Sequence, residues 1–185
     1  RSACSVPQPL SQPEPFMVTL RAARATDAFR IVQLLVETQG KSRFAGAVAI
    51  DEHYARKTVA ALIHRHGGIH DGGTCAYVAT DGAGEIEGFI IGLLDRVYHV
   101  GDMLCANDVF LVCSDRADAT AMSKLVSAYL DWADTNPKVY EIHLSWSDAL
   151  ETGCRMGPVF MRKGFTRCGE VFRRDRASIF EREAA

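Results

Sequence analysis

The sequence lacks the features that mark a membrane protein or a nucleic-acid-binding protein. No apolar run approaches the roughly 20 residues that a membrane-spanning helix needs. The formal net charge is only −2, so electrostatics gives no reason to expect a polyanion as the main partner. We expect neither a membrane nor nucleic acid among the partners. Whether the chain forms a homodimer stays open.

Closely spaced cysteine pairs are also missing. The six cysteines form no C-x-x-C motif and are far apart; they are Cys4, Cys75, Cys105, Cys113, Cys154 and Cys168. Three of them lie in apolar, strand-like runs, which favours buried free thiols over a disulfide framework. This usage is typical of a reducing compartment, so we expect a cytoplasmic protein.

A convincing set of metal ligands is absent too. His64, His66 and His70 gather where a predicted helix ends, but only Asp71 lies at a suitable spacing as a further ligand. A solvated helix end is the better interpretation, because cationic side chains suit the dipole there. We expect no metal.

The composition indicates one folded domain that follows a short tail. Of 185 residues, 48% are hydrophobic and 24% charged, which are ordinary values for a globular domain with a substantial core. Residues 1–16 contain four of the six prolines and predict a flexible tail. They have no basic start followed by an apolar stretch, so we do not expect a secretory signal. We assign residues 17–185 to a single domain.

Hydrophobic periodicity predicts an α/β fold, with a mixed sheet flanked by helices. The expected strands cover 18–21, 75–80, 85–99, 103–114, 138–145 and 165–174. The expected helices begin at Thr26, with Thr26 as N-cap, and cover 51–66, 119–134 and 153–163. The apolar face of the first helix is expected at Phe29, Val32, Leu35 and Val36, and that of the second at Tyr54, Thr58, Ala61 and Leu62.

The sequence from Met103 to Asp134 predicts a strand, a turn and a long amphipathic helix. A helix that opens directly after a strand presents unpaired backbone N–H groups and a partial positive charge at one point. Such a point can bind phosphate groups. Any strand–helix crossover has this outline, however. Whether this one binds phosphate therefore has to be judged from the sequence on either side of it.

The chain from Val18 to Arg174 resembles the GCN5-related N-acetyltransferases, which move an acyl group from acyl-coenzyme A to an amine. Three motifs carry the resemblance, namely the hairpin VATDGAGEIEGFIIG, the strand–turn–helix of residues 103–134, and FMRKGF (Phe160 to Phe165), similar to the family's L-Y-x-x-x-G-F. The resemblance implies the acyltransferase fold, acetyl-coenzyme A as co-substrate and a primary amine of a small molecule or protein as acceptor.

The family's pyrophosphate loop, R/Q-x-x-G-x-G/A, corresponds to residues 116–121, but its glycines are replaced. In this alignment Ala119 stands at the first glycine; one residue later, Thr120 and Met122 stand at the glycines. A side chain at a glycine position crowds the approach of a phosphate to the backbone. The implied coenzyme A contacts are Leu111, Val112, Arg116, Ala117, Asp118, Ala119, Thr120, Ala121, Met122, Ser123, Lys124 and Phe160.

The resemblance also implies roles in catalysis. The amide of Leu111 or Val112 would polarise the thioester carbonyl, and Asp108, four residues before Val112, would be the general base. Asp102 and His99 are fallback bases. The family's usual acid, a tyrosine, is replaced by Phe160, which has no proton to donate.

Two readings of this replacement stay open. In the first, Cys154 or Ser147 protonates the departing thiolate, or the thiolate leaves unaided, and the chain is an acetyltransferase. In the second, the chain has lost catalysis and acts by binding coenzyme A or a protein.

Overall fold

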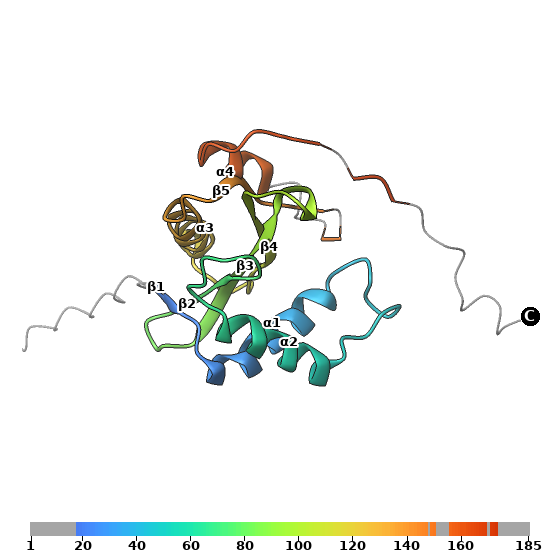
Figure 1. The fold of residues 1–185 in the computed structure, drawn as a ribbon. Coiled ribbons are helices and arrows are strands. Elements are labelled where there is room, and N and C mark those ends of the chain that lie inside the picture. The colour runs from blue at the N-terminus through green and yellow to red at the C-terminus, as the bar shows by residue number, and fades with distance from the viewer. Residues whose placement is uncertain (1–17, 148, 151–155, 170, 174–185) are drawn as a thin grey trace, which may run out of the picture.

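The computed structural model describes residues 18–147, 149–150, 156–169 and 171–173. Its centre is a five-stranded sheet in the order β1-β2-β3-β4-β5 (Figure 1). The strands are β1 (Thr19–Ala22), β2 (Thr74–Thr80), β3 (Ile86–Arg96), β4 (Leu104–Cys113) and β5 (Val139–His143). The first four pair antiparallel in chain order, and β5 alone runs parallel to its neighbour β4. The predicted mixed α/β fold is therefore confirmed.

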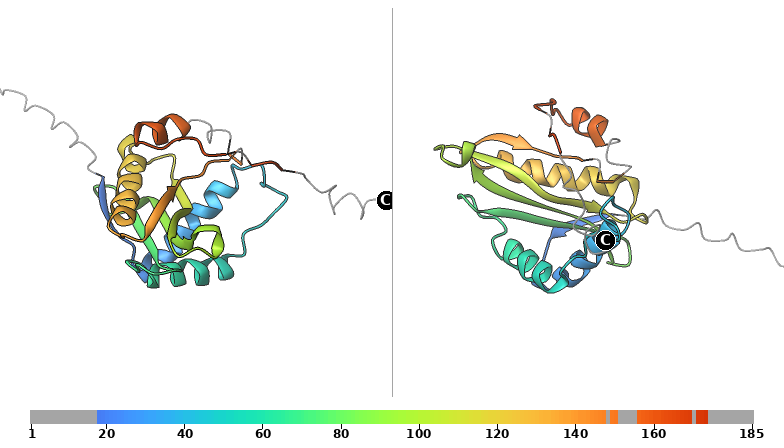
Figure 2. Two further views of the ribbon diagram at one scale, coloured as in Figure 1. Left: turned by 45° about the horizontal axis from the view of Figure 1, so that its top comes forward. Right: turned by 90° about the vertical axis from the view of Figure 1, so that its right-hand side faces the viewer.

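Helices cover both faces of the sheet (Figure 2). Two of them, α1 (Ala28–Gln39) and α2 (Glu52–His64), pack on one face; α3 (Ala119–Asp134) packs on the other, where α4 (Met156–Arg162) also contacts it. The alternating side chains of β3 divide the core between these faces. Phe89 and Ile91 point toward α1 and α2, whereas Ile90 and Leu94 point toward α3. None of the described helices is long and apolar enough to cross a membrane.

The helix α3 has the bounds predicted from its periodicity, and its buried residues include Leu125, Val126, Tyr129 and Ala133. The predicted faces of the other two helices need correction. Val32 of α1 is buried as predicted, but Phe29 is 55% exposed, and the helix also buries Ile31 and Leu34. Likewise Leu62 of α2 is buried as predicted, but Tyr54 is exposed, and the helix also buries Val59 and Ile63. In both helices more than one side is apolar enough to be buried, and the side that contacts the sheet is the one that becomes buried.

Thr26 is not the N-cap that we predicted. A short 3-10 turn, η1 (Ala25–Asp27), precedes α1, and the carboxylate of Asp27 accepts the N–H of Arg24 at 2.7 Å. Arg21 adds an ion pair with Asp27 at 2.6 Å. This part of the chain is therefore held by a buried carboxylate rather than by a hydroxyl.

The predicted strand over 165–174 is also wrong for the residues that the structure describes. Residues 165–169 and 171–173 adopt no strand, and Val171 and Phe172 are exposed. Alternating apolar residues need a partner strand to form a ladder. The described sheet ends at β5, so this stretch has none. Similarly β3 ends at Arg96, and a second 3-10 turn, η2 (Val97–His99), replaces the end of the predicted 85–99 strand.

Candidate active site

The parallel pairing of β4 with β5 stops halfway along β4. The last pair is Asn107 with His143, while β4 continues to Cys113. The predicted strand over 138–145 is thus shortened, because the N–H of Ser145 donates to the side chain of Asp108 and leaves the ladder. Residues 108–113 of β4 consequently present an edge that β5 does not pair. We call this edge the open edge of β4.

A bulge in β4 lies where the open edge begins. Asp108 pairs with Gly92 of β3, and Phe110 pairs with the adjacent Ile91, so Val109 is an extra residue without its own partner. A bulge of this kind bends the strand and increases its twist. The bend fits the separation of β4 from β5 at this point.

Asp108 spans the start of the gap between the two strands. Its Oδ1 accepts the N–H of Ser145 at 2.9 Å and the Ser145 hydroxyl at 3.0 Å. Burial raises the pKa of Asp108 above its ordinary value, while the bonds from Ser145 limit that rise. A partly buried carboxylate with a raised pKa can accept a proton from a reacting group.

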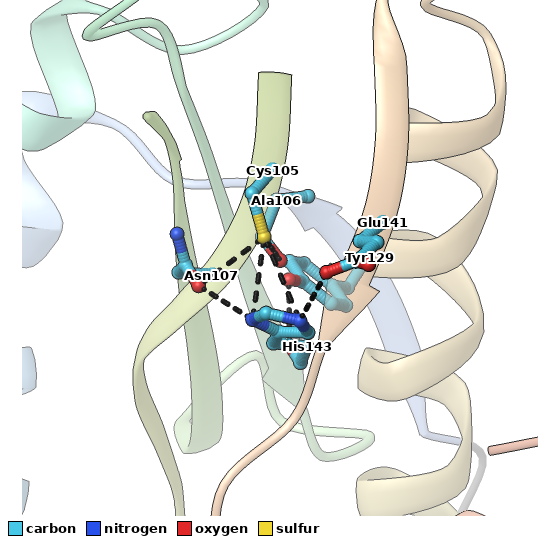
Figure 3. Close-up of polar contacts among 6 residues, drawn as sticks. All are labelled: Cys105, Ala106, Asn107, Tyr129, Glu141 and His143. Atoms are coloured by element: carbon cyan, nitrogen blue, oxygen red, sulfur yellow. Dashed lines mark hydrogen bonds and ion pairs between the residues drawn. The ribbon is translucent and has the colours of Figure 1, made fainter. Parts of the chain in front are cut away.

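Tyr129 of α3 makes a hydrogen bond to the end of β5 (Figure 3). The side chain is fully buried, and its hydroxyl donates to the carbonyl oxygen of His143 at 2.9 Å. Its ring lies so close to Gly92 that a Cβ there would be 2.5 Å from Cε2. One side chain thus contacts β3 opposite the bulge and β5 at its last residue.

The N-terminus of α3 carries a carboxylate where we predicted a phosphate site. Asp118 is the N-cap, and its Oδ1 accepts the Thr120 N–H at 2.7 Å and the Thr120 hydroxyl at 2.6 Å. These hydrogen bonds lower the pKa of Asp118. An exposed negative charge therefore occupies the place that the N–H groups and the dipole prepare for an anion.

The surroundings of the α3 N-terminus are mixed in charge. A small cavity of about 150 Å³ lies beside it, lined by Val18, Ala79, Thr80, Asp81, Glu87, Arg116, Asp118 and Ala121. Three of these residues are acidic, and one is basic. Lys41 pairs with Asp115 at 2.5 Å, and Lys124 donates to Val18 O at 2.8 Å. The charge at the start of α3 is therefore mixed, with the carboxylate of Asp118 at the N-cap itself.

The remaining predicted residues are spread over β4, the segment after β5 and the start of α3, with Phe160 on α4. Leu111 and Val112 lie on β4 within the open edge, and both are half-buried. Ser147 follows β5, is exposed, and accepts the N–H of Ala149 at 3.2 Å. Cys154 lies outside the described residues. The other predicted contacts, Ala117, Ala119, Met122 and Ser123, belong to the turn before α3 and to its first turns.

Phe160 is a packing residue of α4. It is 6% exposed, and its ring centroid lies 6.1 Å from that of Phe165. Lys163 is the residue that follows α4. Its side chain donates to the Ser127 hydroxyl of α3 at 2.6 Å and so holds α4 against α3.

The two fallback bases lie away from Asp108. Asp102 and His99 precede β4, near the pair of Arg96 with Leu104. His99 forms an ion pair with Asp95 at 2.7 Å. Asp108 is therefore the predicted base that the structure places at the gap.

The histidines near the end of α2 fit the expected solvated helix end only in part, because His64 and His70 are exposed whereas His66 is half-buried. The Nδ1 atom of His66 accepts the N–H of Ala76 at 2.9 Å, and its ring packs edge-on against Tyr77. Burial lowers the pKa of His66. This histidine is thus a neutral hydrogen-bond acceptor that joins the end of α2 to β2.

Sequence reasoning missed two contacts at the gap: the bonds from Ser145 to Asp108, and the bond from the Tyr129 hydroxyl of α3 to the carbonyl of His143. Both depend on where the β4–β5 ladder stops. It also missed a polar group on the other face of these strands. The available signal was the spacing of two in C-x-N and E-x-H, which puts each pair on one face of a strand.

Comparison with known proteins supports the fold. No protein-family model and no curated protein matches the sequence. Solved structures do match. An acetyltransferase from Trypanosoma brucei is 15% identical with a TM-score of 0.60, covering 86% of this chain and 100% of that chain.

Two further structures show the same likeness. Glucosamine-6-phosphate N-acetyltransferase from Arabidopsis thaliana is 10% identical with a TM-score of 0.62, covering 86% of this chain and 98% of its own. Ribosomal-protein-alanine N-acetyltransferase from Brucella melitensis biovar Abortus 2308 is 15% identical with a TM-score of 0.58, covering 87% and 100%. The chain therefore has the fold of the GCN5-related N-acetyltransferases.

Proposed function

We propose that the protein is an N-acyltransferase that moves an acetyl group from acetyl-coenzyme A to a primary amine by direct attack. The observation that carries this proposal is the open edge of β4, which begins at a partly buried carboxylate, Asp108, and leads to the N-terminus of α3. The fold of its structural neighbours agrees with acyl transfer. The four described cysteines with free thiols, Cys75, Cys105, Cys113 and Cys168, suit a reducing compartment, and we propose that the enzyme works in the cytoplasm.

Asp108 is the base of this proposal. The attacking amine must lose a proton as its nitrogen bonds to the acyl carbon and the carbon–sulfur bond breaks. A carboxylate with a raised pKa takes that proton more readily, directly or through one water. Ser145 holds the carboxylate in one orientation with its N–H and hydroxyl.

The amide of Leu111 is the proposed donor to the acyl carbonyl oxygen. The N–H of Ser114 donates to Glu87 of β3 at 2.7 Å. Because N–H directions alternate along a strand, the N–H of Val112 also faces β3, whereas that of Leu111 faces the open edge. A backbone donor fixed in this way stabilises the charge that develops on the oxygen.

The departing thiolate needs a proton, and Phe160 cannot give one. Ser147 and Cys154 remain the candidate donors in the segment that follows β5. Pyrophosphate binding at the α3 N-terminus requires the Asp118 side chain to release the Thr120 N–H. Arg116, an exposed residue that lines the neighbouring cavity, is the proposed cation for the phosphates.

The test is consumption of acetyl-coenzyme A over a panel of primary amines by the wild type, Asp108→Asn and Asp102→Asn. An Asn side chain still accepts the Ser145 bonds but cannot take a proton. We expect Asp108→Asn to lower the rate about 100-fold or more with an unchanged melting temperature. Asp102→Asn should behave as the wild type.

Two results would count against the proposal, each in a different way. If the wild type transfers to no amine while it binds coenzyme A, the protein is not an acyltransferase, and the binding-protein reading takes its place. If transfer occurs and Asp108→Asn is as fast as the wild type, the enzyme stands but its base lies elsewhere.

A further inference from the structure

A polar cluster lies on the face of β4 and β5 that points away from α3. Ala106 and Ile142 belong to the core beneath α3, so by alternation their neighbours point to the opposite face. Cys105 and Asn107 come from β4, and Glu141 and His143 come from β5 (Figure 3). We call these four side chains the strand-end cluster.

The atoms of the strand-end cluster are close together. The Cys105 Sγ lies 3.2 Å from His143 Nδ1 and 3.8 Å from its Nε2. The Nε2 atom lies 3.1 Å from Glu141 Oε2, and the Nδ1 atom lies 3.1 Å from Asn107 Oδ1. Among the described residues, Cys105, Glu141 and His143 are the one group of potential metal ligands whose donor atoms all lie within 4.8 Å of one another.

One tautomer of His143 leaves a ring nitrogen available to a metal ion. With the proton on Nδ1, that atom donates to Asn107 Oδ1 at 3.1 Å, an atom that only accepts hydrogen bonds. Nε2 then presents a lone pair to the carboxylate of Glu141 at 3.1 Å. Two acceptors this close need a positive charge between them, which a proton or a metal ion can supply.

A metal ion meets this need with the third donor as well. A ligating histidine commonly donates its other ring N–H to an oxygen, and in the Nδ1–H tautomer of His143 that oxygen is Asn107 Oδ1. Bond lengths of about 2.0–2.3 Å in a tetrahedral zinc site place its ligand atoms roughly 3.3–3.7 Å apart. The observed distances of 3.1 and 3.8 Å from Nε2 to Oε2 and Sγ bracket that range.

We propose that Cys105 Sγ, His143 Nε2 and a Glu141 carboxylate oxygen bind a Zn²⁺-type ion. A mixed sulfur, nitrogen and oxygen set suits zinc among the common divalent ions. The side chains of Glu141 and His143 are 50% and 42% exposed, which leaves room for water as the fourth ligand. The ion would join β4 to β5 across their last three pairs, just before Asp108.

A reactive thiol is the alternative explanation of the strand-end cluster. Reactive thiols are partly exposed and lie in electropositive surroundings. Cys105 is only 6% exposed, and a carboxylate and an amide oxygen lie near its sulfur. A bound cation instead displaces the proton and uses the thiolate as a ligand.

The test uses the full chain, reduced and stripped with a chelator. Titration with Co²⁺ should give one equivalent of bound ion, with the thiolate-to-cobalt absorption of a tetrahedral site. Competition with a chromophoric chelator then gives the Zn²⁺ affinity. Saturating Zn²⁺ should raise the melting temperature, because an ion that binds only the folded state stabilises it.

Variants separate this site from chance binding elsewhere. Cys105→Ala should abolish the thiolate absorption, and Glu141→Gln and His143→Gln should each weaken Zn²⁺ binding more than Asn107→Ala, which should cost about 10–100-fold. His64→Gln is the matched control for a histidine outside the cluster and should change nothing. The far-ultraviolet circular dichroism of each variant verifies its folding.

The proposal is overturned if Co²⁺ shows no thiolate absorption. It is equally overturned if Glu141→Gln keeps the wild-type Zn²⁺ affinity, or if His64→Gln loses as much affinity as His143→Gln. All readouts are independent of acyl transfer, so the metal site and the proposed enzyme activity can fail separately.

Discussion

Replacing Tyr129 by Phe tests whether one hydroxyl holds the end of β5 beside the gap. The ring should stay in place, because Phe keeps the contact with Gly92 and leaves no cavity. Only the 2.9 Å hydrogen bond to the carbonyl of His143 is lost. The variant therefore isolates a single interaction between α3 and β5.

The expected loss of stability follows from the burial of that bond. A typical hydrogen bond contributes about 0.5–1.5 kcal/mol net, and a buried acceptor left without a partner costs about 1–3 kcal/mol. We expect a loss of about 1–2 kcal/mol in the free energy of unfolding. For a domain of this size, each kcal/mol lowers the melting temperature by about 2–4 °C.

Urea and thermal unfolding measure the stability, and hydrogen exchange of the Ser145 N–H measures the local effect. That N–H donates to Asp108 just beyond the residue that Tyr129 holds, so its protection should fall in Tyr129→Phe. The matched control is Tyr140→Phe, since Tyr140 is 69% exposed and should lose nothing. Equal melting temperatures for both variants, with unchanged exchange at Ser145, would refute the reasoning.

Three further predictions concern the same region. Ser145→Ala removes hydroxyl bonds that lower the pKa of Asp108; since the base must be deprotonated, the rise in rate should move to higher pH, as a pH–rate profile will show. Asp118→Ser keeps a cap at the start of α3 but removes its charge, so calorimetry should give several-fold tighter coenzyme A binding, and a gain that does not shrink with salt would contradict the charge argument. Gly92→Ala drives a Cβ against the Tyr129 ring and should cost about 1–3 kcal/mol in chemical unfolding; wild-type stability would show that the ring can move.

The sequence predicted the fold well where the periodicity is long. α3 matched from residue 119 to 134, because its apolar stripe continues over several turns. The faces of α1 and α2 were right at Val32 and Leu62 but wrong at Phe29 and Tyr54, because an apolar body on a side chain does not show whether the sheet covers it. The strand expected after α4 failed for a related reason, because alternation cannot show whether a partner strand exists.

The candidate site, too, was predicted only in part from the sequence. Asp108 was predicted by its spacing from Val112 in a family pattern, and its role in catalysis stays a prediction. Its contacts with Ser145, and the bond from Tyr129 to His143, depend on the residue at which two strands separate. No local pattern contains that information, because it arises from register and from the bulge.

The bulge at Val109 affects the separation of β4 from β5 without changing the face on which each core side chain of β4 lies. Asp108 and Phe110 already oppose Gly92 and the adjacent Ile91, so a chain without Val109 would keep each core side chain on its present face. Its β4 would run straight, however, and β5 could continue to pair beyond His143. A single inserted residue thus favours the separation of β5 from β4 over continued pairing, and the faces of the core side chains are the same either way.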